Sequence, residues 1–577
     1  MRAACLVMIL LLSAAFASTA EPPDSSRPAG DGSIPLVLDG LNVLDTTGTS
    51  WRAGTSVVIR EGRIQDVYAT GSRRAPNGAR VLDLRGRYAI PGLIDAHVHL
   101  TAPFVRSGEQ DSLARFYLLG GITAIRDMAG DGIVLRERAR AARAGSALSP
   151  RIYYSTIVAS PGFFTRDRRA AAVAHGGTPG ELAWARAVTS DSGAVAAAAG
   201  AREIGATGIK VYAELPPALL RAVAHEAHAR GLKVWSHATV TPSKPSDAVA
   251  AGVDVLSHVS MCEWESHDSL PDTYSTLLDS SRYGTPADAP ALVRLFSEMH
   301  RRGTMLDATL YVSRRLARGR RVLEGDLSHM RGVDRWANEA ARLAYRSGVR
   351  FVAGTDVSGY PGLNLLSTLH EELAMYVNVV GMTAAEALAT ATSNAAEMLG
   401  AQDDMGTIAR GRFADLLILD ADPLANIRNT RRIAYVVKGG VFHVGDASTA
   451  LEASDTLDWR PSWPGTRMAV LEGDPSNKGR FVFRFWMPGG YWIHPHRHPV
   501  DAHIRVISGT FRVGMGERLD STTTRDVPAG SEITLEAEMS HFEGARGPTV
   551  VEISGEGPWG VTFLDPERDP GRPSATR

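Results

Sequence analysis

Residues 90–99 read Ile-Pro-Gly-Leu-Ile-Asp-Ala-His-Val-His, an apolar run that ends in two histidines one residue apart. The proline and glycine allow the chain to turn, and the apolar residues after them favour a β-strand. Side chains at positions i and i+2 share one face of a strand, so His97 and His99 project in the same direction. Two imidazoles on one face can bind one cation. Two neighbouring histidines without further ligands are nevertheless more often surface residues. The interpretation as a metal site therefore depends on ligands elsewhere in the chain.

Length and composition indicate a globular protein of several domains. The chain has 577 residues, which is too many for a single hydrophobic core. Its apolar content of 44% and charged content of 22% are ordinary for such proteins. Lys and Arg together number 62 against 63 for Asp and Glu, so no basic excess indicates a nucleic-acid partner.

The first twenty residues have the pattern of a secretory signal peptide. Arg2 is followed by an apolar segment, Leu6–Leu12, and by small residues at 18–20. The segment is too short to span a bilayer, although a retained anchor is the alternative. We expect a periplasmic or secreted protein without membrane contact once residues 1–20 are removed. Cys262 is then the one remaining cysteine, so no internal disulfide can form.

The middle of the chain, residues 90–402, alternates short apolar strands with alanine-rich helices. Eight strand candidates are spaced along it, and helices are expected at Pro217–Arg230 and Thr383–Leu399, the latter with a capping box of Thr383 and Glu386. This pattern predicts an α/β fold, a (β/α)8 TIM barrel, whose chemistry sits at the C-terminal ends of its strands. The candidates are Ile90–His99, Gly121–Ile125, Arg151–Ile157, Thr207–Tyr212, Leu232–His237, Val253–Val259, Thr304–Leu310 and Val349–Asp356.

Short alternating runs flank the barrel and predict further β-structure. After a linker at 21–34, residues 35–89 and 403–445 are expected to form one β-sandwich from both ends of the barrel segment. A second linker at 446–456 leads to residues 457–570, where strand-like runs separated by Gly and Pro predict a separate all-β barrel.

Chemically active side chains fall at the ends of the barrel strands. The first strand ends in His97 and His99, and the fourth carries Lys210. The fifth, sixth and eighth end in His237, His258 and Asp356. Chance placement of this set is a poor explanation, so the sequence predicts a metal site.

These residues resemble the amidohydrolase superfamily, in its imidazolonepropionase and prolidase-like branch. The resemblance extends over about residues 35–445 and predicts an enzyme. It is carried by residues 91–99, Gly121–Asp127, Lys210, His237, His258, Gly354–Asp356 and Gly406–Leu416.

The resemblance implies two divalent ions. His97, His99 and Asp356 would bind one, His237 and His258 the other, and a carbamylated Lys210 would bridge them. Burial among cations would lower the pKa of Lys210, as carbamylation requires. If Lys210 instead forms a salt bridge, the site would be mononuclear. Zinc suits these ligands, and manganese or iron would also fit.

The expected reaction is hydrolysis of a carbon–nitrogen bond in a small amide or cyclic amide. Two metals sharing a water lower its pKa and polarise the scissile carbonyl, with Asp356 as general base. Alternatives are a prolidase-like dipeptidase, a lactone or ester hydrolase, and a non-catalytic binding or sensing protein. Against the dipeptidase, residues 238–241 lack the tyrosine that holds a substrate carboxylate in some relatives. His175, Arg166 and Tyr311 are candidate pocket residues.

The C-terminal β domain contains five of the seventeen histidines. Residues 490–498, Pro528–Gly530 and His541 resemble the two cupin motifs, with His496, His498 and His541 at the metal-binding histidine positions. Ala502 occupies the place of the family's glutamate, and its strand neighbours point to the opposite face. A three-histidine site could still bind one further metal ion. The alternative is a domain that shapes the pocket, assembles a homo-oligomer or senses a small molecule.

Overall fold

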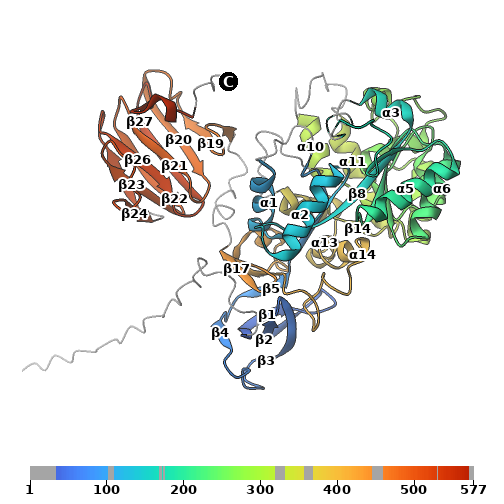
Figure 1. Ribbon diagram of the computed structural model, residues 1–577, viewed down its shortest axis with the longest axis horizontal. Helices are drawn as coiled ribbons and strands as arrows, with labels where there is room; N and C mark the ends of the chain where they lie inside the picture. Colours follow the sequence, from blue (N-terminus) through green and yellow to red (C-terminus); the bar gives the residue numbers. More distant parts are fainter. Residues whose placement is uncertain are drawn as a thin grey trace, which may run out of the picture.

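The computed structural model of the protein contains a barrel, a flanking sheet and a C-terminal β domain (Figure 1). The expected signal peptide, the second linker and His175 lie outside the described residues. Within the described part, no helix is both long and apolar enough to cross a membrane. The described residues are 34–101, 109–167, 170, 172, 174, 176–318, 332–356, 368–444, 459–528 and 531–570.

Eight parallel strands follow one another around the predicted barrel. The first and last strands are joined because the Ala96 N–H donates to the Ala353 carbonyl at 2.8 Å and the Asp356 N–H donates to the His97 carbonyl at 2.8 Å. The barrel prediction is confirmed, with one additional short strand, β9 (Ala185–Ala187), beside β8. The eight are β6 (Leu93–Val98), β7 (Ile122–Asp127), β8 (Arg151–Ala159), β10 (Gly208–Ala213), β11 (Lys233–His237), β12 (Val255–Ser257), β13 (Met305–Asp307) and β14 (Phe351–Val352).

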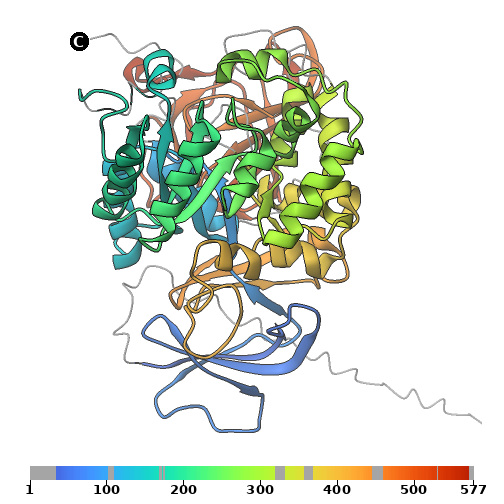
Figure 2. The same ribbon diagram turned by 90° about the vertical axis from the view of Figure 1, so that its right-hand side faces the viewer.

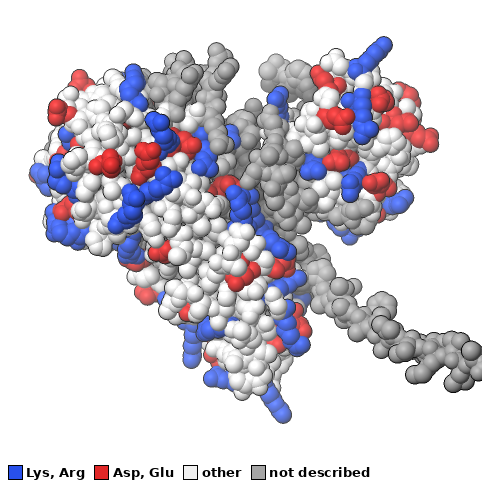
Figure 3. Space-filling view, turned by 180° about the vertical axis from the view of Figure 1, so that it is seen from behind, with Lys and Arg blue, Asp and Glu red and all other residues white. Residues whose placement is uncertain are grey.

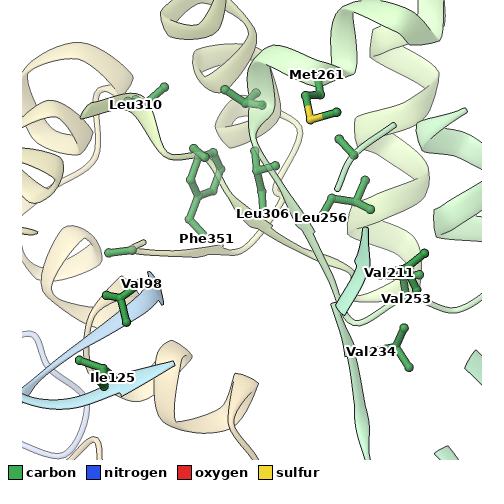
Figure 4. Packing of buried hydrophobic residues seen from close by; sticks show 14 of the residues in the cluster. Val98, Ile125, Val211, Val234, Val253, Leu256, Met261, Leu306, Leu310 and Phe351 are labelled. Atoms are coloured by element: carbon green, nitrogen blue, oxygen red, sulfur yellow. The ribbon is translucent and has the colours of Figure 1, made fainter. Parts of the chain in front are cut away.

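Helices surround the strands (Figure 2), and their apolar faces meet the outer faces of the strands. Val211, Val234 and Leu256 belong to this shared core (Figure 4). The helices are α1 (Glu109–Leu119), α2 (Gly132–Ala144), α3 (Pro161–Arg166), α5 (Asp191–Glu203), α6 (Pro217–His228), α7 (Pro245–Ala250), η1 (Val259–Ser266), α8 (Tyr274–Ser280), α9 (Pro290–Arg302), α10 (Leu310–Arg318), α11 (Val333–Arg346), α12 (Thr368–Met375), η3 (Tyr376–Val380), α13 (Ala384–Thr390) and α14 (Ser393–Met398).

The expected helix at 383–399 is two helices, α13 and α14. The capping box is present, because the Thr383 N–H donates to Glu386 Oε2 at 2.8 Å and the Glu386 N–H donates to Thr383 Oγ1 at 3.2 Å. The break at Ala391 leaves carbonyls free for the barrel: the Ile94 N–H donates to the Ala391 carbonyl at 2.8 Å. The helix is thus interrupted where a buried N–H of a barrel strand needs an acceptor, although the sequence at 383–399 has helical periodicity.

One eight-stranded sheet takes strands from both ends of the barrel segment, which confirms that part of the predicted fold. β15 of the later segment pairs with β5 of the earlier one, with Leu416 opposite Pro91. Leu38, Val57 and Ile418 share its buried core. The strands are β1 (Leu36–Leu44), β2 (Trp51–Arg60), β3 (Arg63–Ala69), β4 (Arg80–Asp83), β5 (Tyr88–Pro91), β15 (Leu416–Leu419), β16 (Ile433–Lys438) and β17 (Val441–Val444), with η4 (Ile427–Arg431) between β15 and β16.

The C-terminal domain consists of two antiparallel sheets with their own core, which includes Phe481, Phe511 and Val551. The Phe116 ring of α1 lies 5.8 Å from the Trp486 ring of β20. Acidic and basic residues are interspersed over the face seen in Figure 3. The strands are β18 (Arg460–Pro461), β19 (Arg467–Glu472), β20 (Gly479–Met487), β21 (Trp492–Arg497), β22 (Ala502–Ser508), β23 (Thr510–Met515), β24 (Arg525–Pro528), β25 (Glu532–Leu535), β26 (His541–Ala545), β27 (Thr549–Gly557) and β28 (Thr562–Phe563), followed by η5 (Pro566–Arg568).

Candidate metal centre at the C-terminal end of the barrel

The ends of β6 and β14 bring three predicted ligands together. His99 Nε2 lies 3.1 Å from Asp356 Oδ1, and His97 Nε2 lies 3.6 Å from the same oxygen. One ligand atom from each residue falls within 4.8 Å of the other two. Two imidazole nitrogens and a carboxylate oxygen at this spacing can surround one divalent ion.

The other predicted ligands continue this cluster across the barrel. His258 Nδ1 lies 3.9 Å from Asp356 Oδ2, the second oxygen of the same carboxylate. The His258 ring is 5.0 Å from the His97 ring and 5.0 Å from the His237 ring. Asp356 therefore lies between the two imidazole groups that the family resemblance assigns to two ions.

Lys210 occupies the fourth barrel strand and is completely buried. Within the described part of the chain its Nζ has no hydrogen-bond partner. Burial lowers the pKa of Lys210 below its ordinary value, and the charge of Asp307 only partly opposes this effect. A buried amine without a partner is costly as an ammonium ion and better accommodated as a neutral or modified group.

Burial also favours the neutral form of three histidines, in which a ring nitrogen has a lone pair available for a metal ion. It lowers the pKa of His97 and His237 well below the ordinary value and that of His258 to about 3. Burial alone would raise the pKa of Asp356, but the nearby histidines, His97 foremost, outweigh it and hold the pKa below its usual range. Neutral imidazoles around an ionised carboxylate are a donor set that fits divalent metal ions.

Asp307, at the end of β13, is a site residue that the sequence analysis missed. The His97 Nδ1–H donates to Asp307 Oδ2 at 2.6 Å, which directs the His97 Nε2 lone pair toward Asp356. Arg126 of β7 approaches the same Asp307 oxygen at 3.3 Å. The available signal was an acidic residue at the end of the seventh strand, analogous to Asp356 at the eighth.

The ends of the sixth to eighth strands adopt unusual backbone conformations. His258, Thr309 and Asp356 have φ values of 69°, 50° and 51°, in the left-handed region that side chains other than glycine seldom adopt. Thr309 Oγ1 lies 3.0 Å from His258 Nδ1. Such strained residues persist where surrounding contacts hold them, and two of these three, His258 and Asp356, are candidate ligands.

Gly354 permits the close approach of β14 to β6. A Cβ atom at this position would lie 2.3 Å from Asp307 Oδ1 and 2.6 Å from the His97 Cβ. We expect Gly354→Ala to displace this histidine–carboxylate pair and to weaken metal affinity by about 10- to 100-fold, as losing an outer-shell partner does. Metal titration of the full chain measures this effect. Gly284→Ala is the control, because its added Cβ would meet nothing within 4 Å among the described residues. Equal metal affinity in Gly354→Ala and Gly284→Ala would contradict the requirement for glycine at position 354.

Two tyrosines lie against His237. The Tyr274 ring stacks on the His237 ring at 5.2 Å with an interplanar angle of 12°, and the Tyr212 ring is 4.3 Å away. Neither belongs to residues 238–241, where the sequence analysis looked for a tyrosine. Tyrosine side chains therefore reach this side of the site from β10 and α8 instead.

The predicted pocket residues that the structure describes lie beyond strand ends. Arg166, in α3 after β8, pairs with Glu214 at 2.5 Å and is about half exposed. The Tyr311 N–H, at the start of α10 after β13, donates to Glu372 Oε2 at 2.6 Å. Their role in a pocket, like that of His175, stays a prediction.

In the C-terminal domain, His496, His498 and His541 come together as expected, and a fourth residue joins them. The structure adds Glu543, which lies two residues beyond His541 on β26. Glu543 therefore lies beside the expected three histidines. Ala502, at the position where a glutamate was sought, belongs to the apolar core.

Comparison with known proteins identifies the family. The model of the amidohydrolase family matches residues 88–442, more than half of the chain, so the chain belongs to that family and is a hydrolase of it. Residues 447–531 match the ChrR cupin-like domain. The imidazolonepropionase of Methylobacterium sp. (strain 4-46) is 27% identical over 399 residues, covering 64% of this chain and 88% of that protein. A dihydroorotase of Anaeromyxobacter dehalogenans (strain 2CP-C) is 40% identical over 91 residues, covering 16% and 20%.

Solved structures share the fold. A Xaa-Pro dipeptidase with bound methionine in the active site has a TM-score of 0.58 and 22% identity, covering 71% of this chain and 100% of that one. A putative prolidase from Bifidobacterium longum has a TM-score of 0.56 and 25% identity, covering 73% and 98%.

Proposed function

We propose that this protein is an exported, binuclear metal hydrolase that cleaves a carbon–nitrogen bond in a small amide or cyclic amide. The observation that carries the proposal is the buried Lys210 Nζ on the fourth barrel strand, which has no hydrogen-bond partner among the described residues. It shares the barrel with four histidines and Asp356. A salt-bridged lysine, the alternative, would need a carboxylate partner, and no such pair involving Lys210 occurs among the described residues. Export rests on residues 1–20.

The ligand residues fall into two groups around the proposed carbamate. His97, His99 and Asp356 would hold one ion, and His237 and His258 the other, with Lys210 between them. A neutral Lys210 amine adds to carbon dioxide and releases one proton, and the resulting carboxylate replaces the ammonium charge that burial disfavours. Zinc is the first choice for this donor set. When bound, the ions acidify a water and polarise the substrate carbonyl.

The proton transfers in this proposal belong to Asp356. Its two oxygens face different imidazole groups, Oδ1 toward His97 and His99 and Oδ2 toward His258. A carboxylate in this position can accept a proton from the attacking water and deliver it to the leaving nitrogen. Asp307 and Thr309 orient His97 and His258 and do not contact the reacting atoms in this scheme.

A dipeptidase is the second candidate. Tyr274 and Tyr212 place aromatic side chains against His237, where a hydroxyl could hold a substrate carboxylate. The similarity to a Xaa-Pro dipeptidase structure and to a putative prolidase agrees with this candidate.

A substrate screen distinguishes the candidates. The full chain, reconstituted with zinc or manganese and bicarbonate, is assayed against N-acyl amino acids, X-Pro dipeptides, cyclic amides and lactones. We expect turnover of simple or cyclic amides. Turnover restricted to dipeptides would favour the second candidate, and turnover restricted to lactones would replace carbon–nitrogen cleavage by ester hydrolysis. A fully metal-loaded protein that binds but never hydrolyses these compounds would contradict the proposal.

A further inference from the structure

Four buried side chains of the C-terminal domain form a cluster that the proposed barrel chemistry does not use. His496 of β21 is the register partner of His541 of β26, so two imidazoles face each other across adjacent strands. His498 follows β21, and Glu543 lies on the same face of β26 as His541. One ligand atom from each residue lies within 4.8 Å of the others. All four side chains are at most 5% exposed.

Backbone carbonyls fix the orientation of the three imidazoles. His496 Nδ1 lies 2.7 Å from the His494 carbonyl, His498 Nδ1 lies 2.9 Å from the Gly560 carbonyl, and His541 Nδ1 lies 2.8 Å from the Met539 carbonyl. A carbonyl oxygen only accepts, so each Nδ1 carries the hydrogen and donates it. A neutral ring then has its lone pair on Nε2, which is the arrangement found in histidine metal ligands.

The centre of the cluster contains acceptors that lack donors. His496 Nε2, His541 Nε2 and Glu543 Oε1 are buried atoms without hydrogen-bond partners in the described part of the chain. His541 Nε2 and Glu543 Oε1 lie 3.4 Å apart. Buried polar groups are nearly always satisfied, so this arrangement needs either a proton or a cation. A proton on His541 would pair it with Glu543 but would leave His496 Nε2 without a donor.

We propose that Glu543 is the fourth ligand of the metal site that the cupin resemblance predicts in this domain, so that one divalent first-row transition metal ion is bound by three histidine Nε2 atoms and the Glu543 carboxylate. The carboxylate therefore comes from β26, two residues after His541, and not from position 502 in β22. Imidazole and carboxylate together suit zinc, iron, manganese or nickel. This centre is independent of the barrel ions, because its ligands all belong to β21, β26 and the segment after β21.

Metal analysis of matched full-length variants tests the proposal. The wild-type chain, Glu543→Gln and His503→Ala are stripped with a chelator and reloaded with zinc alone, and bound zinc per chain is measured. Glutamine keeps the shape of the side chain but removes its charge. His503 is an exposed histidine on β22, in the other sheet of the domain and outside the cluster, so His503→Ala is the control. We expect Glu543→Gln to lose one equivalent, or to bind it about tenfold or more weakly, while the control keeps it.

A spectroscopic readout separates this centre from the barrel. Cobalt loading of a Lys210→Ala chain should still give the visible absorption of a cobalt–imidazole site, and adding Glu543→Gln should reduce it. Equal zinc content and zinc affinity in Glu543→Gln and the wild type, with cobalt spectra unaltered, would overturn the assignment of Glu543 as a ligand. His496→Asn provides the same test if Glu543→Gln does not fold. A chain that binds no ions in the barrel, but still binds the one zinc ion that Glu543→Gln removes, would contradict the proposed barrel centre and leave the Glu543 proposal intact.

Discussion

Replacing Asp356 with asparagine is expected to reduce kcat by about 1,000-fold or more, because general-base catalysis contributes about 10²- to 10⁴-fold and the same carboxylate is a proposed metal ligand. Asparagine retains the shape of the side chain but cannot accept and return a proton. The pKa of Asp356 lies below the ordinary range of an aspartate, so the native carboxylate is ionised at neutral pH. Steady-state kinetics on the best substrate of the screen measures kcat and KM separately.

The matched control for that variant is Asp404→Asn. Asp404 is an exposed carboxylate that pairs with Arg63 at 2.9 Å in the flanking sheet. Its replacement should leave kcat within about twofold, since exposed ion pairs contribute little to stability. A reloaded Asp356→Asn enzyme with near-native kcat would show that another group transfers the proton.

Replacing Lys210 with alanine is expected to remove the bridge between the two proposed ions. At least one barrel ion should be lost, and kcat should fall by about 100-fold or more because the two-metal chemistry is incomplete. The cavity left by the lysine stem can admit a small carboxylic acid, so formate or acetate should restore part of the activity. Metal content and kcat are measured with and without the added acid.

Lys233→Ala is the control for the lysine replacement. Lys233 lies at the start of the next strand, β11, and pairs with Asp254 at 3.0 Å, away from the strand ends that carry the ligands. Its loss should change neither metal content nor the response to formate. Unaltered metal content and activity in Lys210→Ala would contradict the bridging role.

The barrel was predictable because short apolar strands alternate with alanine-rich helical segments along residues 90–402. The break between α13 and α14 was not, because the carbonyl that Ile94 requires belongs to a distant segment. Local periodicity reports helix propensity and carries no information on which buried strand needs an acceptor.

The candidate ligands near strand ends were predictable because they are polar residues that directly follow or interrupt apolar runs, whereas the residues that contact them were not. Asp307 contacts His97, and only the folded barrel shows that their side chains meet. Glu543 was overlooked because the sequence comparison expected a carboxylate at position 502. The pairing of β21 with β26, which places His496 opposite His541, brings Glu543 into the cluster instead.

The most direct test of the central claim is the ¹³C NMR spectrum of the enzyme reloaded with zinc and ¹³C-bicarbonate, recorded with its zinc content. A Glu543→Gln background removes the ion proposed for the C-terminal domain. We predict two zinc ions per chain and a carbamate carbon signal, both reduced by Lys210→Ala and unaffected by Lys233→Ala. One zinc ion per chain without a carbamate signal would contradict a binuclear centre built on Lys210.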